Sequence, residues 1–206
     1  MSLPQRRPWL PVFAWCVTGF NMLVIAWGAL VRATGSGAGC GSHWPQCNGS
    51  LLPDLARIET AIEFGHRVSS VLAGLLVIIL VLWVMRSNLN RLTRLSSWSS
   101  LAFIILEGIL GALLVRLELV ADNTSTLRAG VVALHLVNTL MLLASLGLTA
   151  FASGRVKPVS LTRRPTRVVT WLLGIGLVAM ALLSAMGAVT ALGDTLFPAT
   201  SLSTGF

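Results

Sequence analysis

The stretch Glu63-Phe64-Gly65-His66-Arg67 stands at the start of a long apolar run, Val68 to Met85, that contains no charged residue. A carboxylate, an imidazole and a guanidinium thus fall within about one and a half helical turns. They lie at the edge of a segment long enough to cross a bilayer. Ionisable groups are costly in that environment and are usually functional. The stretch therefore predicts a functional site at one end of a membrane-spanning helix.

The composition is that of an integral membrane protein. Hydrophobic residues make up 55% of the 206 residues and charged residues 11%, against about 25% charged residues in a soluble domain. We attribute the net charge of +8 to basic loops and expect no nucleic-acid partner. The first apolar segment is too long for a cleavable signal peptide, and no small-residue cleavage site follows it.

Five apolar runs are each long enough to span a bilayer, which takes about 20 residues as a helix. They predict an all-α fold, a polytopic membrane helix bundle. The expected helices cover residues 9–31, 59–85, 95–115, 129–152 and 168–191. We expect a short basic turn with Arg86, Arg91 and Arg94 between the second and third helices.

A weak internal repeat suggests the domain organisation. Small residues recur near the ends of three helices, at Gly28-Ala29, Gly111-Ala112 and Gly187-Ala188, and the exit of the fifth helix loosely echoes that of the first. Helical repeats are common in membrane proteins. Residues 1–155 are thus expected to form a four-helix N-terminal transmembrane unit. Residues 156–206, with a basic inner loop, the fifth helix and an outer tail, would begin an incomplete second unit.

The distribution of Lys and Arg predicts the orientation, because cytoplasmic loops are enriched in these residues. With the N-terminus in the cytoplasm, ten of the 15 fall on the cytoplasmic side, and no Asp or Glu lies in an inner loop. The loop of residues 33–58 and both membrane histidines then lie toward the outer face. Four tryptophans near the inner ends of the runs fit an interfacial belt: Trp9, Trp83, Trp98 and Trp171.

His66 and His135 lie at matching depths in the second and fourth expected helices. Each is about seven residues from the outer end of its helix, roughly 10 Å below the surface. Two imidazoles at one depth on separate helices can ligate a haem iron axially. The alternative is a pair of hydrogen-bonded core histidines. Zinc is disfavoured, because only two nitrogens and no close thiolate are offered at that level.

Glu63 and Arg67 flank this first histidine. Glu63 precedes His66 by three residues, so both project from nearly the same helix face. A carboxylate partly out of water can work as an acid or base, or it could only orient His66 or pair with Arg67. Arg67 suits a haem propionate, but its side chain could equally snorkel toward the headgroups.

Two more polar residues interrupt apolar runs. Glu107, in the third expected helix, could face the bundle interior and pair with a buried Arg or a polar side chain, and the sequence does not say which. Asn138 follows His135 by three residues, so it faces the same side and could hydrogen-bond within the pocket.

The three cysteines differ in their surroundings. Cys40 and Cys47 enclose six residues of a polar loop, a gap that suits a small disulfide loop in the oxidising outer compartment. A structural clip and a redox-active pair both remain open as interpretations. We expect His43 between them to be a solvated loop histidine, and Cys16, in an apolar run, to be a packing residue.

Several separated motifs stand out along the chain: the runs Arg32 to Cys40, Trp44 to Gly49, Glu63 to Arg67, Leu134 to Leu136 and Gly193 to Pro198. Together they resemble the haem A synthase family. The motifs stand in the family's order, and the resemblance covers essentially the whole chain. It implies eight transmembrane helices in two similar four-helix halves. It also implies an oxidoreductase that converts haem O to haem A, for cytochrome c oxidase biogenesis, by oxidising a ring methyl to a formyl group with oxygen from water.

The resemblance also implies roles for individual residues. His66 and His135 would be the pair that holds the substrate haem, and Glu63 would be the acidic catalytic residue. Cys40 and Cys47 would form the loop disulfide, with a part in electron transfer as a further role.

The family's second histidine pair, which binds a haem b cofactor, belongs to helices six and eight, and no histidine follows His135 here. The expectation is a truncated chain or a half completed by a separate polypeptide. Expected partners are membrane lipids, haem, haem O synthase, a quinone or other electron donor, and a second copy of the chain. The expected location is the bacterial plasma membrane.

Other function classes remain open. A membrane thiol or quinone oxidoreductase would work through Cys40 and Cys47, without need of haem. A non-enzymatic bundle would bind haem without transforming it, and a transporter or scaffold would use its intramembrane polar groups only to hold helices together. The pigment of the purified protein separates these classes.

Overall fold

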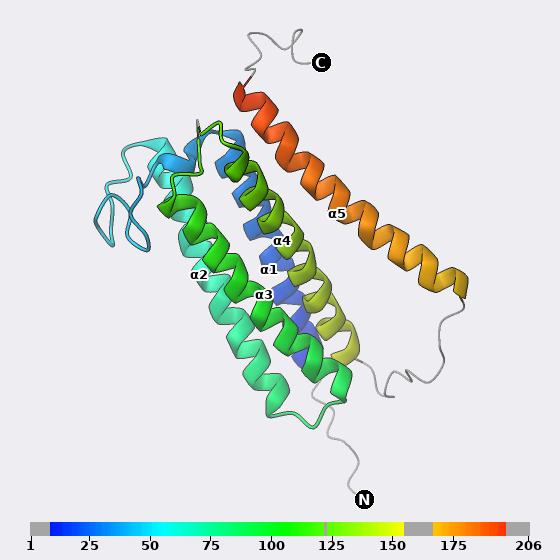
Figure 1. Ribbon diagram of the computed structural model, residues 1–206. Coiled ribbons are helices and arrows are strands. Elements are labelled where there is room, and N and C mark those ends of the chain that lie inside the picture. The colour runs from blue at the N-terminus through cyan, green and yellow to red at the C-terminus, as the bar shows by residue number, and fades with distance from the viewer. Residues whose placement is uncertain (1–8, 122, 155–166, 197–206) are drawn as a thin grey trace, which may run out of the picture. The chain divides into compact units, whose positions relative to one another are not determined.

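All the long elements of the protein are helices (Figure 1). The computed structural model describes residues 9–121, 123–154 and 167–196. In chain order the helices are α1 (Trp9–Ala33), α2 (Ile58–Met85), α3 (Arg91–Arg116), α4 (Thr126–Ser153) and α5 (Arg167–Leu196), with a short 3-10 turn, η1, at Ser36–Ala38. Within the described ranges no strand is present. The predicted all-α fold is confirmed.

Helices α1 to α4 are each long and apolar enough to cross a bilayer. On α2 one stripe of apolar side chains, Val71, Leu75, Ile79 and Leu82, is 47% to 66% exposed. A water-soluble surface rarely carries so continuous an apolar stripe, whereas lipid would cover it. The protein is therefore an integral membrane protein. The described part of α5 contains the apolar segment Thr170–Met180, and its crossing of the membrane stays a prediction.

Helix α3 begins earlier than the apolar run suggests. The Asn90 side chain accepts the backbone N–H of Thr93 at 2.9 Å, which satisfies one donor of the first helical turn. Arg91 and Arg94 therefore lie in the first turn of α3. The prediction that they belong to a turn was wrong, because the capping side chain starts the helix before the apolar residues do.

The ends of α4 and α5 also extend beyond the apolar runs. Ser125 accepts the backbone N–H of Arg128 at 3.3 Å, so α4 starts at Thr126. Helix α5 continues through Gly193 to Leu196, where an exit loop was expected. The basic segment 155–166 and the tail from residue 197 lie outside the described residues.

The chain divides into two compact units, and both contain parts of α1 to α4. The first unit consists of Met1–Ala29, His66–Gly108 and Thr139–Arg164, and the second of Leu30–Gly65, Ile109–Asn138 and Pro165–Phe206. This division runs across the helices. The sequence-based division into residues 1–155 and 156–206 groups whole helices instead, and it stays a prediction.

The core of the first unit joins α1, α2 and α4, which lie side by side there (Figure 1). Each helix contributes residues three or four positions apart, as one helical face requires: Leu10, Ala14 and Val17 from α1, Val77, Leu80 and Val84 from α2, and Leu142, Leu146 and Ala150 from α4. Cys16 lies off this face and is exposed, so within the described residues it does not serve as the packing residue that the sequence predicted. Trp83 packs against Phe13, with ring centroids 5.5 Å apart.

Buried hydroxyl groups join α3 to α4 in the same unit. Thr149 donates to the Ser96 hydroxyl at 2.9 Å, and Ser100 donates to the Ser145 hydroxyl at 3.0 Å. Small polar side chains let helices approach closely in lipid and hydrogen-bond across the contact. These hydrogen bonds form a seam of serine and threonine side chains between α3 and α4. They add specific attraction between the two helices, which apolar packing alone does not provide inside a membrane.

In the second unit, the loop between α1 and α2 packs on the first turn of α2 through Gly39. A Cβ atom at this position would lie 2.5 Å from the backbone C and O atoms of Glu59. Gly39 has an ordinary φ of −63°, so glycine is needed for space and not for its backbone freedom. The loop is thereby held against the segment of α2 that carries Glu63.

We expect Gly39→Ala to lower the free energy of unfolding by about 1–3 kcal/mol, because the backbone of α2 cannot yield to the added methyl group. Denaturant unfolding of the purified protein measures this change. Gly74→Ala is the matched control, since no atom lies within 4 Å of its Cβ position. Equal stability of both variants would contradict the close packing of the loop.

Candidate functional site

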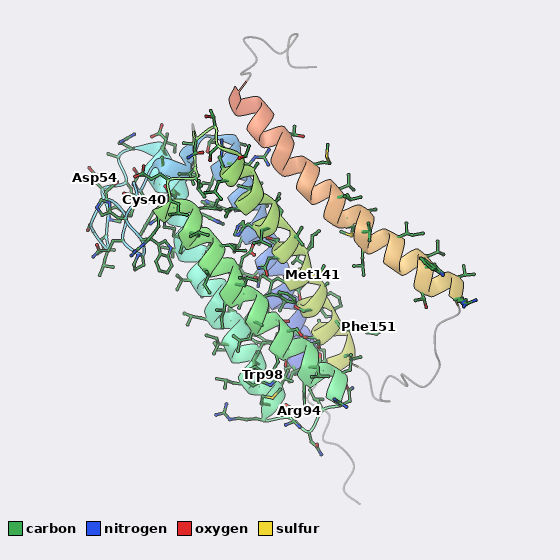
Figure 2. The ribbon with its side chains drawn as sticks, in the orientation of Figure 1. Cys40, Asp54, Arg94, Trp98, Met141 and Phe151 are labelled. Carbon is green, nitrogen blue, oxygen red and sulfur yellow. A yellow bond between two sulfur atoms is a disulfide. The ribbon has the colours of Figure 1, made fainter. Side chains whose placement is uncertain are left out.

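Glu63 is the carboxylate of the predicted site, and only 3% of its surface is exposed. Its Oε2 atom accepts a hydrogen bond of 2.8 Å from the backbone N–H of Cys40. Cys40 belongs to the loop between α1 and α2 (Figure 2). A buried carboxylate needs such donors, because an unsatisfied one is strongly destabilising. The loop therefore forms one wall of the Glu63 site.

The carbonyl of the adjacent residue, Gly39, is also held. Thr60 on α2 donates its hydroxyl to this oxygen at 2.8 Å, and the Asn48 side chain donates to it at 3.2 Å. The sequence alone assigned neither Thr60 nor Asn48 a role in the site. The spacing of Thr60, three positions before Glu63, was the available signal, since it places the two side chains on one face of the helix.

Cys40 and Cys47 form a disulfide bond, with S–S 2.01 Å and Cα–Cα 4.4 Å. Both residues are 0% exposed, and the Cys40 carbonyl accepts the N–H of Asn48 at 2.9 Å. Thiol exchange requires an accessible sulfur atom, so this burial favours a structural clip over a redox-active pair. His43, within the loop, is exposed, as expected for a solvated histidine.

The His66 ring packs against the backbone of α1 in the first unit. A Cβ atom on Gly28 would lie 3.1 Å from His66 Cε1 and 3.4 Å from Nε2. The ring thus occupies the space that a side chain at position 28 would fill. The hydroxyls of Ser69 and Ser70 both donate to the His66 carbonyl, at 2.9 and 2.7 Å, and are thereby satisfied within α2.

His135 and Asn138 lie on α4 in the second unit. His135 is half-buried, and Asn138 is 4% exposed. His66 and His135 belong to different units, so their facing arrangement stays a prediction, as does the role of Arg67, which is half-buried beside His66 on α2.

Glu107 has a polar partner on the neighbouring helix. Thr139 of α4 donates its hydroxyl to Glu107 Oε1 on α3, within the first unit. The sequence left this partner open between an arginine and a polar side chain, and the structure supplies a threonine. This bond joins α3 to α4 as the serine and threonine seam does.

The two membrane histidines offer the ligand type that a haem iron takes, and their pairing on one iron stays a prediction. Haem iron takes one axial ligand from each side, and imidazole is a common ligand. Two half-buried imidazoles come from α2 and α4, and the absence of a side chain at Gly28 makes room for one of them. In the described ranges, no three His, Cys, Asp or Glu residues gather as a metal cluster.

Comparison with known proteins gives the family. Residues 11–204 match the family model of COX15-CtaA, described as cytochrome oxidase assembly protein. The chain belongs to the haem A synthase family. One member, named heme A synthase, from Halalkalibacterium halodurans, is 37% identical over 153 residues, which are 74% of this chain and 50% of that protein.

A second relative, from Thermus thermophilus, is named protoheme IX farnesyltransferase. It is 47% identical over 187 residues, which are 90% of this haem A synthase family chain but 30% of the relative. The chain thus spans half or less of the length of these two curated relatives. No solved structure matches the chain.

We expect Gly28→Ala to displace the His66 ring by a few tenths of an ångström, because the added methyl group would lie 3.1 Å from Cε1. In haem-loaded protein this should shift the absorption bands or lower the haem content. Gly19→Ala on the same helix has open space around its Cβ and should behave as wild type. If the two variants give the same spectrum, Gly28 does not shape the surroundings of His66.

Proposed function

We propose that this chain carries the haem O site of a haem A synthase, and that it takes part in oxidising a methyl group of haem O to the formyl group of haem A. Membership of the haem A synthase family supports a part in haem A biosynthesis. The observation that carries the proposal is the buried Glu63 carboxylate, held by the Cys40 amide at 2.8 Å. It lies one helical turn before His66 on α2.

In this proposal, His66 and His135 would hold the haem through their imidazole nitrogens. Imidazole nitrogens suit this role, and helices of a bundle can present them at one level. Arg67, next to His66, would pair with a haem propionate, because a guanidinium binds carboxylates in a two-point geometry. The packing of His66 on Gly28 would hold one ring in a fixed orientation.

Glu63 would act as the acid or base. Oxidation of a methyl to a formyl group with the oxygen of water releases four protons and four electrons. A carboxylate that is shielded from solvent can accept protons or steady developing charge at the reacting carbon. The electrons require an acceptor, for which a carrier of the quinone class is the proposed partner.

The source of the substrate is the second proposed partner. A relative of this chain is named a protoheme IX farnesyltransferase, and farnesylation of protohaem is the reaction class that supplies haem O. We therefore expect the chain to act next to a haem O synthase in a bacterial plasma membrane. The N-terminus would be cytoplasmic and the cysteine loop outside, as the basic residues indicate.

The pigment of the purified protein tests the proposal. Wild type should show a low-spin, bis-histidine haem spectrum, and His66→Ala and His135→Ala should each abolish it, because each removes one axial nitrogen. His43→Ala removes an exposed loop histidine and should leave the spectrum unchanged. A low-spin spectrum that survives in either of the first two variants would overturn the axial pair.

Glu63→Gln should leave haem bound but lower the conversion of haem O by about 10²–10⁴-fold, the usual contribution of a general acid or base. Membranes supplied with haem O, followed by extraction of the pigment, provide the measurement. Glu59→Gln is the matched control, since that side chain is 44% exposed one turn earlier. Conversion at the wild-type rate by Glu63→Gln would remove Glu63 from catalysis. Bound haem without conversion in wild type would support a non-enzymatic haem-binding function instead.

A further inference from the structure

A single peptide group connects the cysteine loop to Glu63. Its two ends are the Gly39 carbonyl and the Cys40 N–H. The carbonyl accepts the Thr60 hydroxyl at 2.8 Å, and the N–H donates to Glu63 Oε2 at 2.8 Å. Thr60, Glu63 and Cys40 are 1%, 3% and 0% exposed, so water does not compete for either bond.

The geometry of the peptide makes these two bonds interdependent. A peptide group is planar and rigid, and its C=O and N–H point in opposite directions. When the carbonyl is fixed on Thr60, the direction of the N–H is fixed as well. Thr60 and Glu63 are three residues apart on α2 and therefore lie on one helix face, so a single helix holds both ends of this peptide.

We propose that Thr60 is a positioning residue for Glu63. By holding the Gly39 carbonyl, Thr60 directs the Cys40 N–H onto the carboxylate and so sets the plane in which that carboxylate lies. The inference deepens the proposed function and rests on it for the chemical role of Glu63. Thr60 itself needs no contact with the substrate.

Two further features restrain the same peptide and define what Thr60 adds. Gly39 packs against the backbone of Glu59, which limits how far the loop can move. The disulfide from Cys40 to Cys47 closes the loop on its other side. Both restraints keep the loop near α2, whereas the Thr60 hydroxyl and the exposed Asn48 amide bind the carbonyl itself.

The Cys40 amide provides a direct readout, because the chain has only three cysteines and ¹⁵N-cysteine labelling gives three backbone amide signals. An amide proton bound to a carboxylate resonates downfield, and Cys16→Ser assigns the signal of the helix α1 cysteine. Glu63→Gln should move the Cys40 signal upfield. Thr60→Val, which lacks the hydroxyl, should move it in the same direction, and Thr60→Ser should restore it to the wild-type position.

The Cys16 amide is the folding control, and Thr60→Ala is a second variant without the hydroxyl in case valine does not fit. A Cys40 signal at the wild-type position in a folded Thr60→Val or Thr60→Ala variant would overturn the proposal, as would a failure of Thr60→Ser to restore it. This measurement needs no haem, so it stands or fails separately from the haem spectrum that tests the proposed function.

Conversion of haem O gives a second, independent readout. Thr60→Val should lower conversion by about tenfold, in line with the loss of one hydrogen bond near a charged group, and Thr60→Ser should recover it. In a Glu63→Gln background, Thr60→Val should cause no further loss, because both changes act through the same carboxylate. Independent, multiplicative losses would show that Thr60 acts by another route.

Discussion

The hydrogen bond from the Cys40 amide to Glu63 is the interaction on which the loop between α1 and α2 in the second unit depends. A carboxylate near the end of a membrane-spanning helix has little water to bind, so the protein must supply its donors. Here the donor is a backbone amide, which cannot be rearranged without moving the loop. The loop packing at Gly39, the disulfide and the Thr60 hydroxyl all act on the same few atoms.

This arrangement gives the disulfide a role in shaping the site. Cys47 lies beside Asn48, whose backbone N–H and side chain bind Cys40 and Gly39. Closing the loop therefore places the two Asn48 donors on the carbonyls of Cys40 and Gly39. A buried disulfide in this position suits a structural role better than electron transfer. Thiol–disulfide exchange would require the loop to move away from Glu63 and expose the sulfur atoms.

The sequence predicted the helices well, because five apolar runs of membrane-spanning length leave few other folds. It missed the helix starts at α3 and α4, where Asn90 and Ser125 provide the caps outside the apolar pattern. It predicted a packing role for Cys16, which is exposed, because an apolar run that faces lipid looks the same as one that faces protein. The candidate site was predictable only in part. Glu63 and His66 stand out because ionisable residues are rare in apolar runs. The spacing of Thr60 places it on the helix face of Glu63. Its bond to the Gly39 carbonyl arises from the folding of the loop onto α2, a contact between distant stretches that no local pattern encodes.

The proposed function requires that two histidines of this chain hold one haem iron. Pulsed electron paramagnetic resonance of the ferric, haem-loaded chain labelled with ¹⁵N-histidine can detect this pair, because the nuclear couplings report the ligand atoms themselves. We expect strong coupling to two histidine nitrogens, in wild type and equally when His43 is replaced. Coupling to a single histidine nitrogen, or to none, would contradict the axial pair.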